Sequence, residues 1–295
     1  MMNTRYSIND LEKITGIKAH TIRMWEKRYN AVEPERTSTN IRYYKDCDLK
    51  KLLNISTLNK HGIKISHIIQ MDPEEINDKI MEISNTSSDF ETYINSLVVA
   101  MIEINEDVFE NILSNTLLKI GFEKTVTHVL YPFLEKIGIL WLIGTINPAQ
   151  EHFIVNLIRQ KLIVAIDAQK TTHNETSKTF LLFLPEKELH ELGLLFYTYL
   201  IKKSGHKVIY LGQSVPSEDV IKVINIRQVD YLFTYFVSAM APEDIPDYLK
   251  KLSSALSDKR IFITGFQLQN NQFKLPENIT AVKNADEFKD LLKTL

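Results

Sequence analysis

The chain has 295 residues, 44% of them hydrophobic and 24% charged, which is typical of a folded protein with two or three domains. Its longest apolar runs are far shorter than the roughly 20 residues of a membrane helix, and no secretory signal opens it, so we expect neither a membrane span nor secretion. The single cysteine, Cys47, excludes disulfide frameworks and cysteine metal clusters and favours the cytoplasm.

Charge is distributed unevenly along the chain. Residues 1–70 contain 13 Lys/Arg and 7 Asp/Glu, a balance of +6, whereas the remaining 22 Lys/Arg and 30 Asp/Glu give −8. A basic head on an acidic body is typical of a nucleic-acid-binding domain joined to a part that does not touch nucleic acid. A random fluctuation is the alternative, and charge by itself does not exclude it.

The basic head predicts short helices and a hairpin. Ser7 and Asp10 have the spacing of a capping box, which starts a helix that Gly16 ends. A second helix is expected over residues 19–29. The polar stretch 34–44 suits a hairpin wing, and a third helix from about residue 46 is separated from a fourth by Gly62.

The next segment, residues 73–168, is helical in pattern throughout, because apolar residues recur at three- and four-residue spacing. Gly138 lies within one helix. Asn147 is a good N-cap, and Pro148 suits the first position of the helix that follows. We expect a bundle of about four helices.

After a polar linker at 171–177 the pattern changes to short apolar runs that alternate with amphipathic helices. Such alternation predicts a doubly wound, flavodoxin-like parallel sheet with helices on both faces. The expected strands are 179–184, 207–211, 231–237 and 260–264, with a last strand at 279–282, and the expected helices are 189–203, 217–226, 242–256 and 285–292.

The head resembles the winged helix-turn-helix of MerR-type regulators. The matching residues are Tyr6-Ser7-Ile8, Gly16-Ile17, the run TIRMWEKRY from Thr21 to Tyr29, Pro34, Arg36-Thr37, the run NIRYY from Asn40 to Tyr44, Asp48-Leu49, Ile55, Leu58 and Gly62. The resemblance implies dimers on palindromic DNA operators. The long antiparallel dimer helix of the metal- and drug-sensing branches is not evident here.

The second head helix has the two faces that a recognition helix needs. Ile22, Trp25 and Tyr29 share one face for the core, and the other face is left for the major groove. Each cation singly is equally well explained as a solvated charge, whereas the set in this frame favours DNA. The predicted DNA-binding residues are Lys18, His20, Thr21, Arg23, Lys27, Arg28, Arg36, Thr37, Asn40, Arg42 and Tyr43.

Three loops of the last segment follow strands and should meet at the carboxyl edge of the sheet. Glu188-x-His190-x-x-Gly193 follows the first strand, Ser238 the third and Gly265 the fourth. This pattern resembles the cobalamin-binding fold. The resemblance implies that His190 replaces the cofactor's own base as lower cobalt ligand and that Glu188 binds its other nitrogen.

The helical segment adds Trp141 followed, after nine residues, by Glu151-His152, which resembles the signature of CarH/LitR-type cobalamin photoreceptor regulators. The resemblance implies that Trp141 packs on the adenosyl side of adenosylcobalamin and that His152 is a candidate upper cobalt ligand. It also implies repression in the dark that light releases. Singly, each of these residues is better explained as an ordinary core or surface residue, whereas the set in register with Glu188, His190 and Gly193 favours common ancestry.

Two positions depart from the cobalamin pattern. Met240 replaces a leucine of similar volume, and Phe266 stands where the family has the second glycine of a Gly-Gly pair that leaves room for the nucleotide tail. If the ring of Phe266 points inward, it fills that room. If it points outward, the room stays open.

We therefore expect three domains: a DNA-binding head (1–75), a helical bundle (76–170) and a cobalamin-type sheet domain (178–295). The predicted function is a transcription regulator, a repressor, whose sensor half controls oligomerisation to a dimer or tetramer, in the cytoplasm and on the nucleoid. The alternative is the same fold without cofactor, with the C-terminal half as an oligomerisation or protein-interaction module that meets an antirepressor. The head and the lack of a substrate domain argue against an enzyme.

Overall fold

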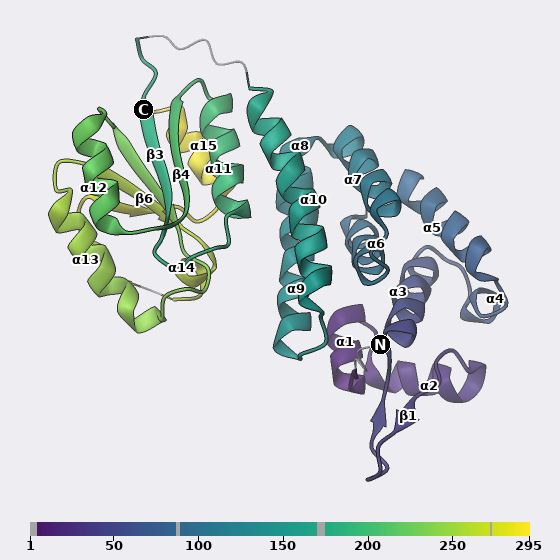
Figure 1. Cartoon of the computed structure of the whole chain (residues 1–295). Helices are drawn as coiled ribbons and strands as arrows, with labels where there is room; N and C mark the ends of the chain where they lie inside the picture. Colours follow the sequence, from purple (N-terminus) through teal and green to yellow (C-terminus); the bar gives the residue numbers. More distant parts are fainter. Residues whose placement is uncertain (1–4, 87–88, 170–174, 272) are drawn as a thin grey trace. The chain divides into compact units, whose positions relative to one another are not determined.

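The computed structural model describes residues 5–86, 89–169, 175–271 and 273–295 (Figure 1). It divides into two compact units, an N-terminal unit of residues 1–154 and a C-terminal unit of residues 155–295, and the division falls within helix α10 (Pro148–Asp167). In the described part of the chain, no helix has the length and apolarity that crossing a membrane requires.

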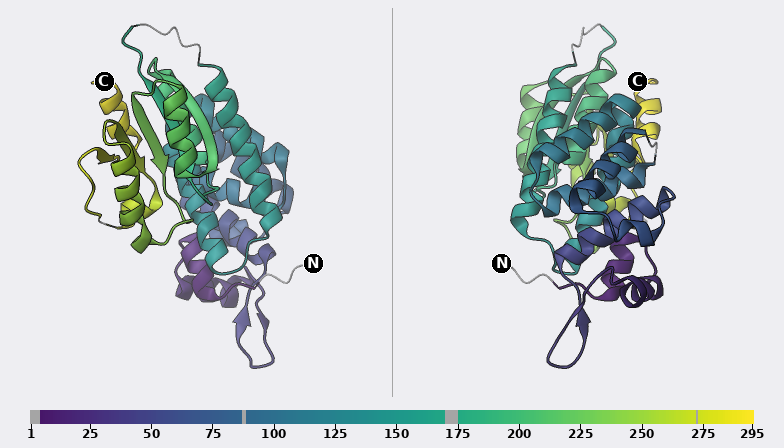
Figure 2. Two further views of the ribbon diagram at one scale, coloured as in Figure 1. Left: turned by 60° about the vertical axis from the view of Figure 1, so that its left-hand side comes forward. Right: turned by 90° about the vertical axis from the view of Figure 1, so that its right-hand side faces the viewer.

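The head forms the predicted helices and hairpin. Ser7 accepts from the N–H of Asp10 at 3.2 Å while the Asp10 carboxylate accepts from the N–H of Ser7 at 2.8 Å, and Gly16 ends the first helix at φ +73°. In both views of Figure 2 the hairpin projects from the head helices. The elements are α1 (Ile8–Thr15), α2 (Ala19–Tyr29), β1 (Glu35–Arg36), β2 (Arg42–Tyr43), α3 (Asp46–Lys60) and α4 (Ile65–Ile68).

The core of the head positions α2. Ile22 and Trp25 of α2 are buried with Leu11 of α1 and Leu52 of α3, and each fully buried side chain of this kind contributes about 1.5–3 kcal/mol. Tyr29 is only half-buried, because it lies in the last turn of α2 at the edge of this core. The opposite face of α2 is thereby held toward solvent.

The described residues of the helical segment form five continuous helical stretches, where about four helices were expected, and one of these stretches comprises three consecutive elements. A π-helical turn joins α8 and α9 just before Pro132, which cannot donate a backbone hydrogen bond. Asn147 caps α10 by accepting from the N–H of Ala149 at 2.9 Å. The elements are α5 (Pro73–Thr86), α6 (Phe90–Ile102), α7 (Glu106–Ile120), α8 (Phe122–Thr125), η1 (Val126–Leu130), α9 (Tyr131–Leu142) and α10.

The C-terminal unit is the predicted doubly wound sheet. Its five parallel strands lie in the order β4-β3-β5-β6-β7, so the chain changes direction between β3 and β5, which is the topological switch point. The strands are β3 (Thr179–Pro185), β4 (Lys207–Val215), β5 (Tyr231–Tyr235), β6 (Arg260–Thr264) and β7 (Ile279–Ala281). The helices are α11 (Leu192–Lys203), α12 (Ser217–Ile226), η2 (Pro242–Asp244), α13 (Ile245–Ala255), α14 (Phe266–Asn270) and α15 (Ala285–Leu292).

Alternate side chains of the strands supply two cores. Leu181 and Phe183 belong to the cluster that α12 and α13 cover, whereas Phe180 contacts Phe288 of α15 on the other face. Figure 1 shows α12 and α13 on one side of the sheet and α11 and α15 on the other. Both faces are buried, as parallel sheets require.

The sheet differs from the prediction at its carboxyl edge. The helix expected from residue 189 begins at Leu192, because residues 186–191 turn back across the strand ends. The strand expected to reach residue 237 ends at Tyr235, and α14 was not predicted. Of the predicted linker, residues 171–174 lie outside the described residues. The differences at residues 186–191, at residues 236–237 and at α14 adjoin the loops of the candidate site.

Candidate functional site

Helix α2 carries the predicted recognition residues on its solvent face. Its N-terminus is held from α1, since the Glu12 carboxylate accepts from the N–H of Ala19 at 3.1 Å and pairs with Lys18 at 3.1 Å. His20, Arg23, Lys27 and Arg28 are exposed and Thr21 is half-exposed. The solvent face of α2 is therefore accessible to a ligand along the whole helix.

A groove of about 470 Å³ separates α2 from the hairpin. Of the predicted residues, Arg23 and Lys27 of α2 and Arg36 and Arg42 of the hairpin line it, whereas Lys18, His20 and Arg28 do not. The Arg28 guanidinium instead lies 5.3 Å from the ring centroid of Tyr29. The complete lining is Arg23, Glu26, Lys27, Asn30, Val32, Glu33, Pro34, Arg36 and Arg42.

The hairpin tip is ordered by its own residues. Asn40 adopts φ +65°, a left-handed conformation that asparagine tolerates, and Arg36 donates to its side-chain oxygen at 2.7 Å. The Thr37 hydroxyl accepts from the N–H of Ile41 at 3.1 Å. At the base, Tyr43 donates to Glu35. The predicted wing residues therefore form one small, internally bonded unit.

Glu26 of α2 connects this wing to the recognition helix. This residue was not among the predicted site residues. Its carboxylate lies 3.3 Å from the Arg42 guanidinium and accepts from the Tyr44 hydroxyl at 3.2 Å. Burial and the nearby Glu26 carboxylate raise the pKa of Tyr44 to about 12, so this hydroxyl stays a donor. A lone acidic residue on the DNA-facing helix was the available signal, because its charge opposes that of DNA.

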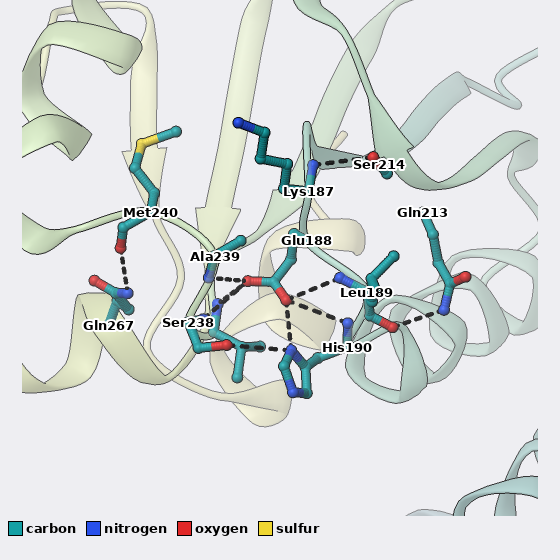
Figure 3. A network of polar contacts seen from close by, with 11 residues as sticks. Lys187, Glu188, Leu189, His190, Gln213, Ser214, Ser238, Ala239, Met240 and Gln267 are labelled. Carbon is teal, nitrogen blue, oxygen red and sulfur yellow. Dashed lines mark hydrogen bonds and ion pairs between the residues drawn. The ribbon is translucent and has the colours of Figure 1, made fainter. Parts of the chain in front are cut away.

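In the C-terminal unit, the buried Glu188 carboxylate connects two loops (Figure 3). One oxygen accepts from Nδ1 of His190 at 2.6 Å and from the N–H groups of Leu189 and His190 at 3.1 and 3.2 Å. The other accepts from the N–H groups of Val237, Ser238 and Ala239 at 3.1, 2.9 and 3.1 Å. The loops after β3 and β5 thus converge as predicted.

These hydrogen bonds decide the ionisation of Glu188. Burial raises the pKa of this carboxyl, but the bonds from His190 and from the N–H groups of Ser238 and Ala239 outweigh it and lower the pKa to about 2. The acid is therefore ionised at neutral pH. It holds the His190 ring by Nδ1, and this side chain is 55% exposed.

Both predicted glycines are required by close neighbours. A Cβ on Gly265, which has φ +124°, would lie 2.1 Å from the carbonyl oxygen of Phe236. A Cβ on Gly193 would lie 2.5 Å from Cζ of Tyr235. At Gly265 the obstacle is backbone, so no larger side chain fits there, whereas at Gly193 the space is occupied by the end of the Tyr235 side chain.

The bundle residues meet at one end of α9 and α10. The indole N–H of Trp141 donates to Glu151 at 2.6 Å, and 43% of the Trp141 side chain is exposed. His152 follows on α10 and is exposed as well. Trp141 and Glu151 are therefore in contact, and His152 is adjacent to Glu151 in the chain.

Two protein-family models match the chain. The model of the MerR HTH family regulatory proteins matches residues 6–75, which are the head, and that of the B12 binding domain matches residues 93–165, which are the bundle from α6 to α10. The chain is a MerR-type DNA-binding regulator with a B12-binding domain.

Relatives of the regulator agree with this. It is 28% identical to the HTH-type transcriptional repressor CarH of Myxococcus xanthus over 87% of each chain, and 25% identical to the repressor CarA of the same organism over 88% of its own chain and 85% of CarA. The HTH-type regulator MlrA of Escherichia coli is 27% identical over 21% of the regulator and 26% of MlrA. Among solved structures, the monomethylamine corrinoid protein of Methanosarcina barkeri has a TM-score of 0.49 and 14% identity over 74% of the regulator and all of that chain.

The residues of the regulator fit a corrinoid in part. An exposed imidazole held at Nδ1 by a buried carboxylate is a donor set suited to one metal coordination position. Of the two orientations considered for Phe266, the structure has the outward one, because this residue is 57% exposed at the start of α14. The space beside Gly193 is filled nonetheless, by Tyr235, which the sequence did not indicate.

Proposed function

We propose that the regulator represses transcription by binding a palindromic operator through α2 and its wing. The observation that carries this is the groove where Arg23 and Lys27 of the helix face Arg36 and Arg42 of the hairpin. Arginine and lysine on a helix and a wing contact base edges and phosphates, and four cations in one groove suit a polyanion. Two relatives named as transcriptional repressors support the direction of control.

Substitution of groove cations tests this proposal. Arg23→Ala is expected to weaken binding at least about tenfold, and Arg42→Ala to lower the slope of log affinity against log salt by about one unit for a lost phosphate contact. Lys51→Ala, an exposed cation of α3 outside the groove, is the control. Gel-shift titrations use a duplex selected from a random pool. Equal affinity and salt slope for all the proteins would contradict the proposed interface.

We further propose that the C-terminal half senses a corrinoid through His190 as lower cobalt ligand, with Glu188 as its positioning residue. Gly193, Ser238 and Gly265 are proposed to belong to this site. Trp141, Glu151 and His152 are proposed for the upper face, on the strength of their grouping and of the B12-binding match over the bundle. Adenosylcobalamin and release by light are the finer expectations.

Absorbance of corrinoid retained through gel filtration tests His190. Retention is expected for the wild type and for Glu186→Ala, an exposed neighbour, and its loss is expected for His190→Ala. Light-scattering in the same run reports whether loading changes the number of copies. Retention that survives His190→Ala would remove the ligand assignment and leave the DNA-binding proposal intact.

A second candidate function is a cofactor-free assembly module. The Tyr235 ring beside Gly193 favours this second candidate, because the ring occupies interior space that a ligand would need. If it is correct, we expect the same oligomer with and without corrinoid, and no corrinoid absorbance in the protein peak after gel filtration. An antirepressor protein would then be the proposed partner of the C-terminal half.

A further inference from the structure

Tyr235 fills the space beside Gly193. It is the last residue of β5 and is half-buried, and an ideal Cβ on Gly193 would lie 2.5, 2.7 and 2.9 Å from the ring atoms Cζ, Cε2 and Cε1. The hydroxyl end of the ring therefore contacts the backbone of the first turn of α11. The ring thus occupies the space beside this glycine.

The interior beyond this ring is packed with further aromatic side chains. The Tyr197 ring of α11 lies 6.1 Å from that of Tyr235 and 4.6 Å from that of Phe233, measured between centroids. Phe233 in turn lies 5.0 Å from Phe288 of α15. Because protein interiors are close-packed, a long group cannot enter between α11 and β5 unless the Tyr235 ring leaves its position.

The position of Tyr235 also relates it to His190. Glu188 accepts hydrogen bonds from the N–H groups of residues 237–239, and this run begins two residues after Tyr235. The same carboxylate accepts a hydrogen bond from the His190 ring. The backbone of Tyr235 is fixed as well, since it pairs with Thr264 of β6. The ring thus stands at the mouth of the interior, next to the loops that carry the proposed cobalt ligand.

Ligation of cobalt by His190 requires that the lower coordination position of the corrinoid be free. In cobalamin, a nucleotide tail carries the base that occupies the lower cobalt position, so a histidine can take this position only if the tail moves elsewhere. We propose that Tyr235 closes the sheet domain to this tail, and that the corrinoid class admitted at His190 is the one without it, as in cobinamide. The inference rests on the proposed role of His190, and it replaces the expectation of adenosylcobalamin, which carries the tail, by that of a tail-less corrinoid.

Paired titrations with aquacobalamin and diaquacobinamide test the proposal on the full-length protein in the dark. Corrin absorbance and equilibrium dialysis give the two dissociation constants. The wild type and Tyr235→Phe, which keeps the ring, are expected to bind cobinamide at least about tenfold more tightly than cobalamin. Tyr235→Ala is expected to lower this ratio by gaining cobalamin affinity.

Two controls separate the ring from general effects. Tyr231→Ala makes the same truncation four residues earlier on the same strand and is expected to keep the wild-type ratio. His190→Ala is expected to lose cobinamide binding. Circular dichroism verifies folding of each variant, and the wild-type ratio decides the matter even if Tyr235→Ala fails to fold.

The outcomes distinguish this inference from the proposed function. Equal wild-type constants for the two corrinoids, both lost in His190→Ala, would overturn the role of Tyr235 and leave the cobalt ligand standing. Failure of both the wild type and Tyr235→Ala to bind either corrinoid would overturn both. Operator binding is measured separately and depends on neither result.

Discussion

The groove of the head and the carboxyl edge of the sheet are built in opposite ways. In the head, the cations are exposed, and Arg36 and Arg42 bind neighbours that a phosphate can replace. At the sheet edge, the central charge is buried and bonded to six N–H groups, counting the His190 ring and the backbone donors already described. The first surface is adaptable, whereas the second is a fixed interior that admits a ligand only of the right shape.

The largest effect is expected at Gly265, in the fixed interior. Gly265→Ala should destabilise the C-terminal unit by more than about 3 kcal/mol, because the new Cβ meets the Phe236 backbone and the residue has a positive φ. Gly205→Ala, also at positive φ (+85°) but with no atom within 4 Å of the new Cβ, is the matched control and should cost about 1 kcal/mol. Urea unfolding compares them, and equal losses would show that the close approach is relieved at little cost.

Glu188→Gln should have the next largest effect, on the order of 2–3 kcal/mol at neutral pH, since an amide cannot accept all these bonds. The folded pKa of about 2 lies below the ordinary value for Glu, so the stabilisation is complete above about pH 4.5 and is lost as pH falls toward 2. The difference between wild type and variant should therefore shrink on acidification.

The comparison for Glu188 uses the exposed Glu186→Gln as its control, for which no such loss is expected. Thermal unfolding between pH 7 and pH 3 measures all three proteins. A difference that stays constant over this range would mean that the carboxylate contributes by its shape and not by its charge.

The smallest effect should come from the adaptable surface. Asn40→Val places a β-branched residue at φ +65°, a strain of about 1–2 kcal/mol confined to the wing tip. Operator affinity should fall about tenfold while the unfolding midpoint of the protein hardly changes. Asn40→Gly adopts this φ without strain and should lose less affinity than Asn40→Val, and gel-shift titration of both variants measures this. A large loss of stability in Asn40→Val would show that the wing is not independent of the head core.

The elements of the chain followed from local rules. The capping residues Ser7 and Asp10, the N-cap Asn147 and the apolar runs of the strands act within a few residues of themselves, and the helices and strands that they predicted are present. The doubly wound sheet followed from the alternation of short apolar runs with amphipathic helices. Residues that face solvent, such as Arg23 and Lys27, were also predictable, because their placement requires only the helical period.

Only the tertiary structure decided what fills the space between elements. Glu26 meets Arg42, Glu188 binds the loop at residues 237–239, and Tyr235 covers Gly193 across gaps of 16, about 50 and 42 residues. Phe266 conspicuously replaces a glycine yet lies outward, whereas the ring that closes the interior belongs to an unremarkable strand residue. The sequence determined which residues face which side of their own helix or strand. Which side chain fills a space between elements depends on the packing of several elements at once, and no local sequence pattern indicates it.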